Sequence, residues 1–403
     1  MTNLPQGWEV KTLSEIGEIV TGSTPSKSNL DFYGKDYPFF KPSDFEQGYF
    51  LENAGDNLSK LGFGKARQLP PKTILVVCIG SLGKVALTKV IGSCNQQINA
   101  IIPHKNIISE YIYYYCISSK FQSILFSKAP QTTLVILNKT EFSKLEIIYP
   151  KDIKEQERIV GILDFAFSKI DENIKKAKEN LANIDELMQS ALQKAFNPLN
   201  DNTKENYQLP QSWEWKSLGD TSNYGKTSQV KPSQLKGNDW ILELEDIEKE
   251  SGVLLQKVLF QDRQSKSNKI KFNKGDILFG TLRPYLKKVI IADDNGACSS
   301  EIMPFSTGNS ITNHFIYYYL FANFLHDRIS SLTYGARMPR LGTKDGKSLQ
   351  IPLPPLQEQE QIAEHLDFVF EKAKALKELY TKELKDYEEL KQSLLDKAFK
   401  GEL

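Results

Sequence analysis

Cysteine and histidine are scarce in this chain, and net charge is almost absent. There are four of each residue among 403 positions, and the formal net charge is +1. No pair of cysteines has C-x-x-C spacing and no histidine has a second ligand nearby, so neither a disulfide framework nor a metal site is expected. The longest apolar run, Ile74–Ile79, falls far short of the roughly 20 residues that span a bilayer. No signal peptide is visible, so we expect a reducing, cytoplasmic protein without membrane contact.

Catalytic motifs are also missing. The sequence has no G-x-x-x-x-G-K-[ST] loop and no G-x-G-x-x-G after a strand. It lacks the Asn- or Asp-Pro-Pro-aromatic tetrapeptide of adenine methyltransferases. Gly80–Lys84 is too short for a phosphate loop and is expected to be a strand-to-strand turn that presents Lys84. We therefore expect a protein that binds rather than catalyses, with no cofactor or metal of its own.

The sequence contains an internal repeat. LPQGWEVKTL at 4–13 returns as LPQSWEWKSL at 209–218, with seven of ten positions identical. Residues 155–196 align without a gap on 358–399, with 18 of 42 identical. The offset between the copies drifts only from 205 to 203 along the chain. A register kept over about 200 residues indicates two homologous halves in tandem.

Each half opens with a segment that is rich in Gly, Pro, Ser and aromatic residues. Its short apolar runs are enriched in β-branched residues and bounded by turn residues, which predicts strands. The predicted strands are Thr73–Ile79, Val85–Leu87, Ile98–Ile102, Asp276–Phe279 and Lys288–Ala292. The tyrosine-rich segments Glu110–Phe126 and His314–Leu332 are predicted to be helices. Each globular segment is therefore expected to be α+β with a β-rich core.

A long helix is predicted to follow each globular segment. Apolar residues recur at spacings of three and four through both copies, which is the pattern of a coiled-coil seam. In the second copy the seam includes Leu366, Ala373, Leu376 and Leu390. About 42 residues make a rod of roughly 60 Å. The two seams could pair with each other, or each could dock on its own globular segment. The predicted ranges are 1–150, 151–198, 199–354 and 355–403.

The near-zero net charge conceals a segregation. Residues 57–140 contain ten Lys or Arg and one acid, and residues 263–288 contain eight bases and one acid. The compensating acids crowd the predicted helices. A basic excess in both globular segments favours nucleic-acid binding over an ordinary solvated surface. Arg, Gln and Asn beside predicted turns could read base edges, since Arg pairs with guanine and Gln or Asn with adenine.

Several motifs carry a specific resemblance. L-P-x-x-W-E opens each half, G-x-T-P-S follows at 22–26, and G-D-I-L stands at 275–278. I-P-L-P-P-L-Q-E-Q at 351–359 precedes the second helix, and K-A-F-K-G-E-L closes the chain at 397–403. Over its whole length the chain resembles the DNA specificity subunit of type I restriction–modification systems. Ile147–Lys151 departs from the P-L-P-P-L element, which leaves the start of the first helix open.

The resemblance implies two target recognition domains, 1–150 and 199–354, with pseudo-twofold symmetry. It implies that the helices at 151–198 and 355–403 pair as an antiparallel coiled coil and set the gap in a bipartite, asymmetric DNA site. Two methyltransferase subunits, which use S-adenosylmethionine, would dock on the helices. Two motor-nuclease subunits, which use ATP and Mg²⁺, would complete the enzyme. The chain itself would be a non-catalytic subunit that binds double-stranded DNA.

The resemblance also selects candidate DNA-binding residues. Residues 130–133 match the family's loop ahead of the last recognition-domain strand, and 337–341 are the counterpart in the second half. Together with the loops between strands, these segments supply the candidates Lys84, Gln97, Gln131, Thr132, Thr133, Arg283, Tyr285, Lys287, Arg337 and Arg340.

Two other hypotheses remain open. The first is a coiled-coil adaptor that joins two proteins without DNA specificity. The second is a self-sufficient nuclease built on the acid-x-Lys spacing of Glu383 and Lys385. Those two residues fall in the second helical pattern, where solvated charge is the expected role.

Overall fold

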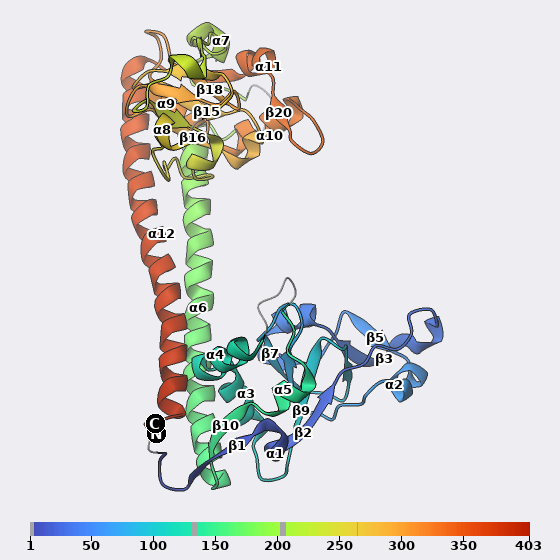
Figure 1. Cartoon of the computed structure of the whole chain (residues 1–403). Coiled ribbons are helices and arrows are strands. Elements are labelled where there is room, and N and C mark those ends of the chain that lie inside the picture. Colours follow the sequence, from blue (N-terminus) through green and yellow to red (C-terminus); the bar gives the residue numbers. More distant parts are fainter. Residues whose placement is uncertain (1–3, 130–134, 202–206, 264) are drawn as a thin grey trace. The chain divides into compact units, whose positions relative to one another are not determined.

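The chain divides into two compact units in a computed structural model that describes residues 4–129, 135–201, 207–263 and 265–403. One unit contains residues 1–177 and 382–403, and the other contains residues 178–381. Each unit therefore holds one globular segment together with half of each long helix. Figure 1 shows the elements in chain order.

Unit 1 is built on a five-stranded sheet in the order β2-β9-β6-β7-β4. A three-stranded sheet, β5-β3-β8, lies outside it. The strands are β2 Gly17–Thr21, β3 Tyr33–Phe40, β4 Phe50–Leu51, β5 Asp56–Leu58, β6 Ile74–Val77, β7 Val85–Thr88, β8 Ser93–Cys94 and β9 Ile98–Pro103. Short helices α1 Leu13–Ile16, α2 Lys60–Lys65 and α5 Lys139–Ser143 complete the segment.

Unit 2 repeats the central part of this plan. Its three-stranded sheet β16-β15-β18 matches β7-β6-β9. A four-stranded sheet, β12-β14-β17-β13, shares a buried hydrophobic cluster with it. The strands are β12 Gln229–Val230, β13 Trp240–Leu242, β14 Lys269–Phe272, β15 Ile277–Gly280, β16 Val289–Ile291, β17 Gly296–Cys298 and β18 Ile302–Phe305. Its short helices include α7 Leu218–Thr221, α8 Phe260–Arg263 and α11 Thr343–Ser348. The five predicted strands are confirmed, and no end moves by more than two residues.

The segment at the W-E motif of each half contains a strand that closes its unit. β1 (Trp8–Thr12) pairs antiparallel with β10 (Glu146–Pro150), directly before the first long helix. β11 (Glu214–Ser217) pairs in the same way with β21 (Gln350–Leu353) before the second. The repeat thus brings the first and last strands of each globular segment together.

The tyrosine-rich segments each form two helices rather than the single helix that the sequence predicts. They are α3 Ser109–Ile117 and α4 Ser119–Lys128 in unit 1, and α9 Asn313–Tyr319 and α10 Asn323–Leu332 in unit 2. Ser118 has extended backbone angles and its hydroxyl accepts a hydrogen bond from the amide of Phe121, so it ends one helix and caps the next. Apolar periodicity does not reveal this break, because both helices bury their apolar faces in one core.

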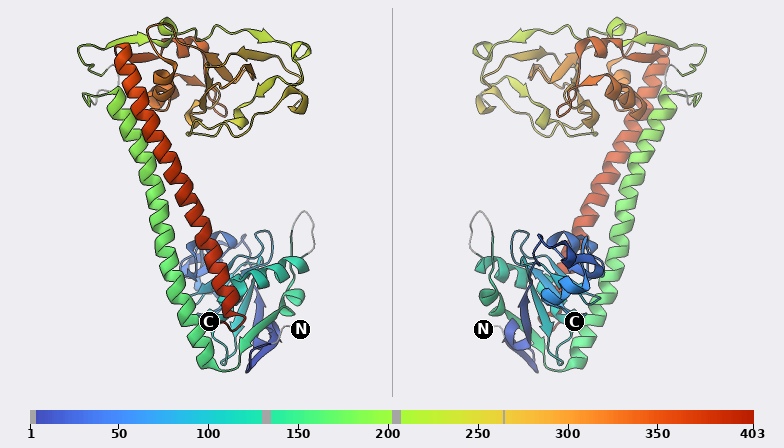
Figure 2. Two further views of the ribbon diagram at one scale, coloured as in Figure 1. Left: turned by 90° about the vertical axis from the view of Figure 1, so that its left-hand side faces the viewer. Right: turned by 90° about the vertical axis from the view of Figure 1, so that its right-hand side faces the viewer.

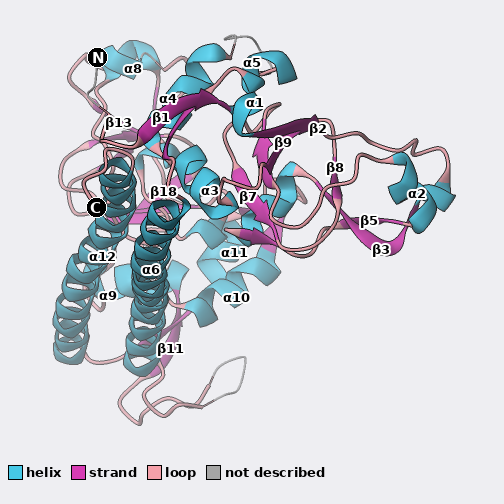
Figure 3. Cartoon of the chain, turned by 90° about the horizontal axis from the view of Figure 1, so that it is seen from below, coloured by secondary structure: helices cyan, strands magenta, loops and turns pink. Residues whose placement is uncertain are grey.

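That core joins the sheet to the long helices. In unit 1, Tyr111 and Tyr114 of α3 cluster with Ile74 and Val76 of β6 and with Ile159 of the first long helix. Figure 3 shows α3 near β7 and that helix. In unit 2, Phe315 and Tyr319 of α9 pack against Phe196 with ring centroids 5.1 Å apart. Each globular segment is therefore fastened to the helices by a buried aromatic cluster.

The two long helices, α6 (Ile153–Phe196) and α12 (Leu356–Ala398), begin at equivalent positions of the repeat. A fully buried glutamine explains this agreement. The Gln156 side chain donates to the carbonyls of Pro150 and Asn106 and accepts from the amide of Ile108. Gln359 makes the matching three bonds, to Pro354, Ser310 and Thr312. The start of α6 therefore does not depend on the missing P-L-P-P-L element.

Within each unit the two long helices lie side by side and run in opposite directions, as the two views of Figure 2 show. In unit 1 the Lys391 ammonium lies 2.6 Å from the Asp171 carboxylate. In unit 2 Asn180 donates to the Tyr380 hydroxyl at 3.1 Å, and Ile184 packs with Ala373. The antiparallel pairing is confirmed. The alternative of separate docking is wrong, because residues of both helices share each domain core.

The seam was wrong at two positions. Leu376 is 41% exposed and Leu390 is 46% exposed, although both fall on the predicted apolar line. A straight helix turns every 3.6 residues, so a line drawn at steps of three and four drifts around its surface. Among the described residues, no helix is long and apolar enough to cross a membrane.

Candidate nucleic-acid interface

The hairpin loop between β15 and β16 presents candidate residues of unit 2. It contains one 3-10 turn, Pro284–Leu286, between Arg283 and Lys287. Both flanking residues have left-handed backbone angles, with φ of 50° and 46°. Such angles cost a side-chain-bearing residue about 1–2 kcal/mol, and strain of this kind collects at functional sites. The loop conformation is therefore held by its neighbours.

Two other segments hold this loop through backbone hydrogen bonds. The Arg283 amide donates to the Pro339 carbonyl at 2.7 Å, and the Leu341 amide donates to the Thr281 carbonyl at 2.9 Å. The Thr281 amide donates to the Glu301 carbonyl at 2.8 Å. Three segments far apart in sequence thus converge, and we call residues 281–288, 299–301 and 335–341 the unit 2 loop cluster.

The loop cluster exposes most of its predicted residues. Arg283 and Arg337 are exposed, and the Tyr285 ring is 50% exposed. Arg340 lies in β20 (Arg340–Leu341), which pairs with β19 (Thr333–Tyr334), and its guanidinium donates to the Ser300 carbonyl at 3.4 Å. The guanidinium of Arg283 makes no hydrogen bond or ion pair with the described residues. It is therefore available to a ligand.

Lys287 differs from the other candidates because its side chain is buried. Its ammonium donates to the Phe321 carbonyl at 3.1 Å and to the Asn323 side chain, and burial lowers its pKa. The φ of 46° turns this side chain inward while keeping the loop in place. The sequence could not distinguish it from Lys288, whose ammonium bonds the Leu244 carbonyl at 2.7 Å. In this arrangement Lys287 supports the loop and does not offer its charge at the surface.

Unit 1 contains the same cluster of loops. The Gly80 amide donates to the Val135 carbonyl at 3.1 Å, and the Leu137 amide donates to the Cys78 carbonyl at 2.9 Å. The Cys78 amide donates to the Gln97 carbonyl at 2.8 Å. Here the two left-handed positions are glycines, Gly80 and Gly83, with φ of 81° and 90°. The predicted turn between β6 and β7 is confirmed.

Two predicted residues lie in this unit 1 loop cluster. Gln97 is half-buried, and its carbonyl oxygen Oε1 accepts from the Asn95 side chain at 2.9 Å. The Lys84 ammonium pairs with the Glu46 carboxylate in a solvent-exposed ion pair, which contributes little to stability and can exchange for a phosphate. Gln131, Thr132 and Thr133 lie outside the described residues. Contact of any of these residues with DNA remains a prediction.

The basic excess of the sequence is partly neutralised by acids from outside the basic windows. Lys89 pairs with Glu52, and the buried Lys269 ammonium lies 2.6 Å from the Glu243 carboxylate. Arg263 grips the buried Asp246 carboxylate through both of its terminal nitrogens. Burial opposes ionisation of Asp246, but the bonds from Arg263, Glu243 and Gln256 prevail and lower its pKa. Charge counted along the sequence therefore overstates the free positive charge.

Sequence reasoning missed Glu301. It stands in unit 2 where Gln97 stands in unit 1, because its carbonyl accepts the same bond from the strand-end amide. The spacing from Cys94 to Ile98 repeats from Cys298 to Ile302, and this spacing would have found it. Glu301 lines a pocket of about 540 Å³ that also touches Arg283 and Met338.

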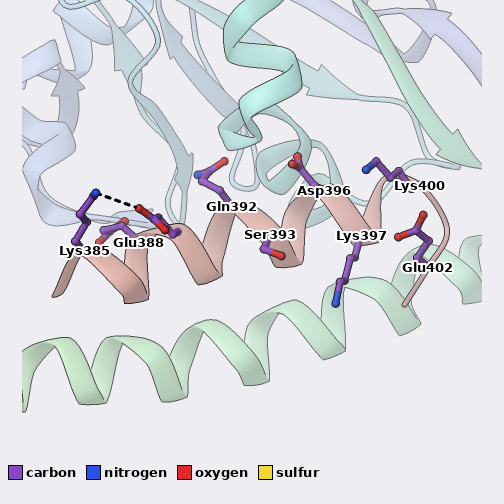
Figure 4. A pocket seen from close by; sticks show the side chains of 9 residues that line it. Lys385, Glu388, Gln392, Ser393, Asp396, Lys397, Lys400 and Glu402 are labelled. Atoms are coloured by element: carbon purple, nitrogen blue, oxygen red, sulfur yellow. Dashed lines mark ion pairs between the residues drawn. The ribbon is translucent and has the colours of Figure 1, made fainter. Parts of the chain in front are cut away.

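The acid-x-Lys residues lie on α12, beside a groove of about 600 Å³ along its last turns. Figure 4 shows that side chains of both charge signs, including Lys385 and Asp396, line this groove. The Glu383 carboxylate accepts from the Tyr387 hydroxyl at 2.6 Å, and Lys385 pairs with Glu389. The two groups are therefore engaged separately on the helix surface. Within the described part of the chain, no three His, Cys, Asp or Glu residues gather as a metal site.

Two β-rich domains, each with three converging loops and each joined to an antiparallel helix pair, define a duplicated binding protein. A profile of the type I restriction modification DNA specificity domain matches residues 5–183 and 210–385. Because the match covers most of both halves, the chain belongs to this family.

Curated relatives agree with this assignment. The type I restriction enzyme HindI specificity subunit of Haemophilus influenzae is 39% identical over 176 residues, which are 42% of this chain and 38% of that subunit. The MjaIX specificity subunit of Methanocaldococcus jannaschii is 29% identical over 226 residues, which cover 54% of this chain and 52% of the relative. The match thus spans less than two thirds of each of these relatives. The EcoDI specificity subunit of Escherichia coli is 23% identical over 99% of this chain and 89% of its own.

Solved structures share the fold. A chain from work on assembly and conformational transition of the type I R-M system matches with a TM-score of 0.79 at 19% identity, over 100% of both chains. The HsdS subunit from Thermoanaerobacter tengcongensis matches with a TM-score of 0.55 at 20% identity, over 99% of this chain and 98% of its own. These similarities confirm the predicted fold class.

Proposed function

We propose that this chain is the sequence-specific DNA-binding subunit of a type I restriction–modification enzyme. Each globular segment reads one half of a bipartite asymmetric site on double-stranded DNA, and the paired helices set the gap. The observation that carries the proposal is the duplicated loop cluster. The same three segments converge in both units through equivalent backbone bonds, but the side chains that they present differ. Two recognition domains with the same loop arrangement but different contact residues suit an asymmetric site.

The chemistry of the loop clusters supports this reading. Arg283, Arg337 and Arg340 supply planar guanidinium groups at one cluster, and such groups pair with guanine O6 and N7. Lys84 and Gln97 stand at the other cluster. Lysines over the globular segments would neutralise phosphates, and this contribution to affinity falls as salt rises. The loops would specify bases while the phosphate contacts position the protein.

The long helices offer a surface for partner subunits. Phe165 on α6 is 69% exposed, and Phe368 on α12, at the equivalent place in the repeat, is 60% exposed. Each follows an aspartate that accepts a tyrosine hydroxyl, Asp164 from Tyr114 and Asp367 from Tyr318. An exposed phenylalanine retained in both copies indicates two copies of one partner. We assign this partner as a methyltransferase subunit.

The remaining partners and cofactors follow from the same assignment. The chain is non-catalytic and holds no cofactor. Two methyltransferase subunits would supply the S-adenosylmethionine site, and two motor-nuclease subunits would use ATP and Mg²⁺. A reader without a methyltransferase pocket cannot hold a flipped adenine, so a partner must. The assembly would act in the cytoplasm.

The decisive experiment maps N6-methyladenine on a plasmid library after co-expression of this chain with the methyltransferase encoded beside it. We expect one bipartite motif with a fixed gap. A matched variant, Arg337→Ala with Arg340→Ala, should relax only the half-site read by unit 2, at about 1–3 kcal/mol for each lost bidentate contact. Equal loss at both half-sites would assign these arginines to phosphate binding or folding.

The adaptor hypothesis predicts a different result. A stable complex without methylation, and without salt-dependent binding to duplex DNA, would favour an adaptor over a specificity subunit. Cleavage of DNA by the isolated chain, lost on Glu383→Gln, would favour the nuclease hypothesis. Neither outcome is expected, because Glu383 and Lys385 are engaged separately on α12.

A further inference from the structure

Gln97 and Glu301 occupy the same place in the two loop clusters but have different chemistry. Each follows the short strand that ends in a cysteine, Cys94 or Cys298, and each gives its carbonyl to the amide at the end of the neighbouring strand. An amide side chain presents both a donor and an acceptor, whereas an ionised carboxylate only accepts. The two units therefore present different hydrogen-bonding groups at one equivalent point.

The Glu301 carboxylate is available to a ligand. It is half-buried and makes no hydrogen bond or ion pair with the described residues. The other acids that line its pocket, Glu243 and Glu245, lie within ion-pair distance of Lys269 and Arg263. Among the described charged residues that line the pocket, only Arg283 is similarly free, since Lys288 bonds a backbone carbonyl. One acceptor and one planar donor thus remain at the surface of the pocket.

A free carboxylate in a DNA interface cannot serve phosphate binding, because the two negative charges repel each other. It is favourable only where it accepts a hydrogen bond from a base amino group. In the major groove, cytosine offers its N4 amino group, whereas adenine offers N6 beside the acceptor N7. A carboxylate placed at adenine would meet the lone pair of N7, so cytosine is the better partner. Guanine, the partner of cytosine, presents the two acceptors that Arg283 would bind.

We propose that Glu301 determines specificity by accepting a hydrogen bond from the N4 amino group of a cytosine in the half-site read by unit 2. This inference rests on the proposed function. Gln97 occupies the corresponding place over the other half-site. Its Oε1 accepts from Asn95 at 2.9 Å and its Nε2 donates to the Ile79 carbonyl at 3.4 Å, so one acceptor and one donor position of the amide remain for adenine. The exchange of one side chain then changes the base read, while the shared backbone bonds keep both loop clusters in the same form.

The test maps N6-methyladenine motifs for the wild-type chain and for Glu301→Gln, each co-expressed with the methyltransferase partner. The wild-type motif should contain a cytosine in the unit 2 half-site. The variant should change the preference at that one position by about tenfold, toward adenine, and leave the other half-site and the gap unchanged. Glu248→Gln removes an exposed carboxylate elsewhere in unit 2 and should leave the motif as it is.

If the complex that contains Glu301→Gln does not methylate DNA, a binding measurement still tests the proposal. Wild-type complex is titrated with duplexes in which the cytosine is replaced by 2-pyrimidinone, which lacks the amino group. We expect about tenfold weaker binding by wild type and no further loss for Glu301→Gln.

An unchanged motif in Glu301→Gln, or a wild-type half-site without cytosine, overturns the role of Glu301 and leaves the proposed function intact. Absence of any bipartite motif in the wild type counts against the proposed function itself.

Discussion

Replacing Arg283 by glycine should raise the stability of unit 2 and, at the same time, weaken DNA recognition. The φ of 50° at Arg283 places it in the left-handed region, while Gly80 fills the equivalent position in unit 1. The hydrogen bond from its backbone amide to the Pro339 carbonyl does not involve the side chain. Arg283→Gly and Arg283→Ala therefore both remove the guanidinium, but only the glycine variant removes the backbone strain.

The expected sizes follow from these angles. Left-handed angles cost a residue with a side chain about 1–2 kcal/mol. Against this gain, glycine loses more conformational entropy on folding than other residues, which lowers stability by about 0.5–1 kcal/mol. Arg283→Gly should therefore stabilise unit 2 by about 0.5–1 kcal/mol. For a unit that spans residues 178–381, this corresponds to a rise in Tm of about 1–4 °C. Arg283→Ala should show no such rise.

Both variants should lose the same amount of recognition. A bidentate arginine–guanine contact contributes about 1–3 kcal/mol, or roughly a fivefold to 150-fold change in affinity. Calorimetric unfolding of the full chain would measure stability. Titration of the methyltransferase complex with duplexes altered in either half-site would measure recognition, and only the unit 2 half-site should be affected.

Two results would refute this reasoning. If Arg283→Gly is no more stable than Arg283→Ala, the strain at residue 283 does not have the energy assigned to it. If both variants keep full discrimination at the unit 2 half-site, the guanidinium makes no base contact. After the second result, Arg283 would no longer be a base-reading residue of the unit 2 loop cluster.

Three further changes test the helices and the core. Phe165→Ser and Phe368→Ser should each weaken the binding of one methyltransferase copy by about 2 kcal/mol, seen by native mass spectrometry, while Leu376→Ser, at an exposed leucine whose repeat counterpart is Asn173, should keep both copies. Insertion of four residues in the middle of each long helix adds about 6 Å, so the tolerated gap should grow by about two base pairs with both half-sites unchanged; an unchanged gap would show that the helices do not set it. Burial lowers the pKa of His326 from 6.5 to about 4, so the unfolded chain binds the proton first: the stability of unit 2 should be complete above pH 6.5 and fall by up to about 3 kcal/mol as pH drops to 4. Urea unfolding of wild type and His326→Gln over this pH range would test the assignment. The loss belongs to His326 if the midpoint falls with pH in the wild type and stays constant in the variant. An equal fall of the midpoint in both proteins would contradict the assignment.

The duplication, the mixed α+β class and the two long helices were all predictable from the sequence. These features are written in local patterns: repeated motifs, short β-branched runs between turn residues, and apolar spacing of three and four. Such patterns report on backbone conformation and on which face is buried, because both depend on neighbouring residues. The motif I-P-L-P-P-L-Q-E-Q even contains Gln359, whose buried side chain joins α12 to its domain.

The limits of this prediction lie where conformation depends on distant residues. The break at Ser118 is invisible in the apolar pattern because one core buries the helices on both sides of it. Leu376 and Leu390 fell on the predicted seam, but helix twist carries them to the surface. Charge segregation was visible, yet the partners of Lys89 and Lys269 come from outside the windows in which charge was counted.

The candidate site was predictable only in part. Arg283 and Arg340 were chosen because they flank turns, and the structure brings their segments together through the Arg283–Pro339 bond. Lys287, also a predicted DNA contact, is buried, because its left-handed backbone directs the ammonium to Phe321 and Asn323.

Residue type and local spacing thus determined by themselves that the chain is a duplicated binder with two long helices. Only the tertiary structure decided which side chains meet. Glu301 and Arg283 are 18 residues apart in sequence and line one pocket, because hydrogen bonds between separate strands and loops converge there. Recognition depends on such convergence, and no local pattern encodes which distant segments a loop will contact.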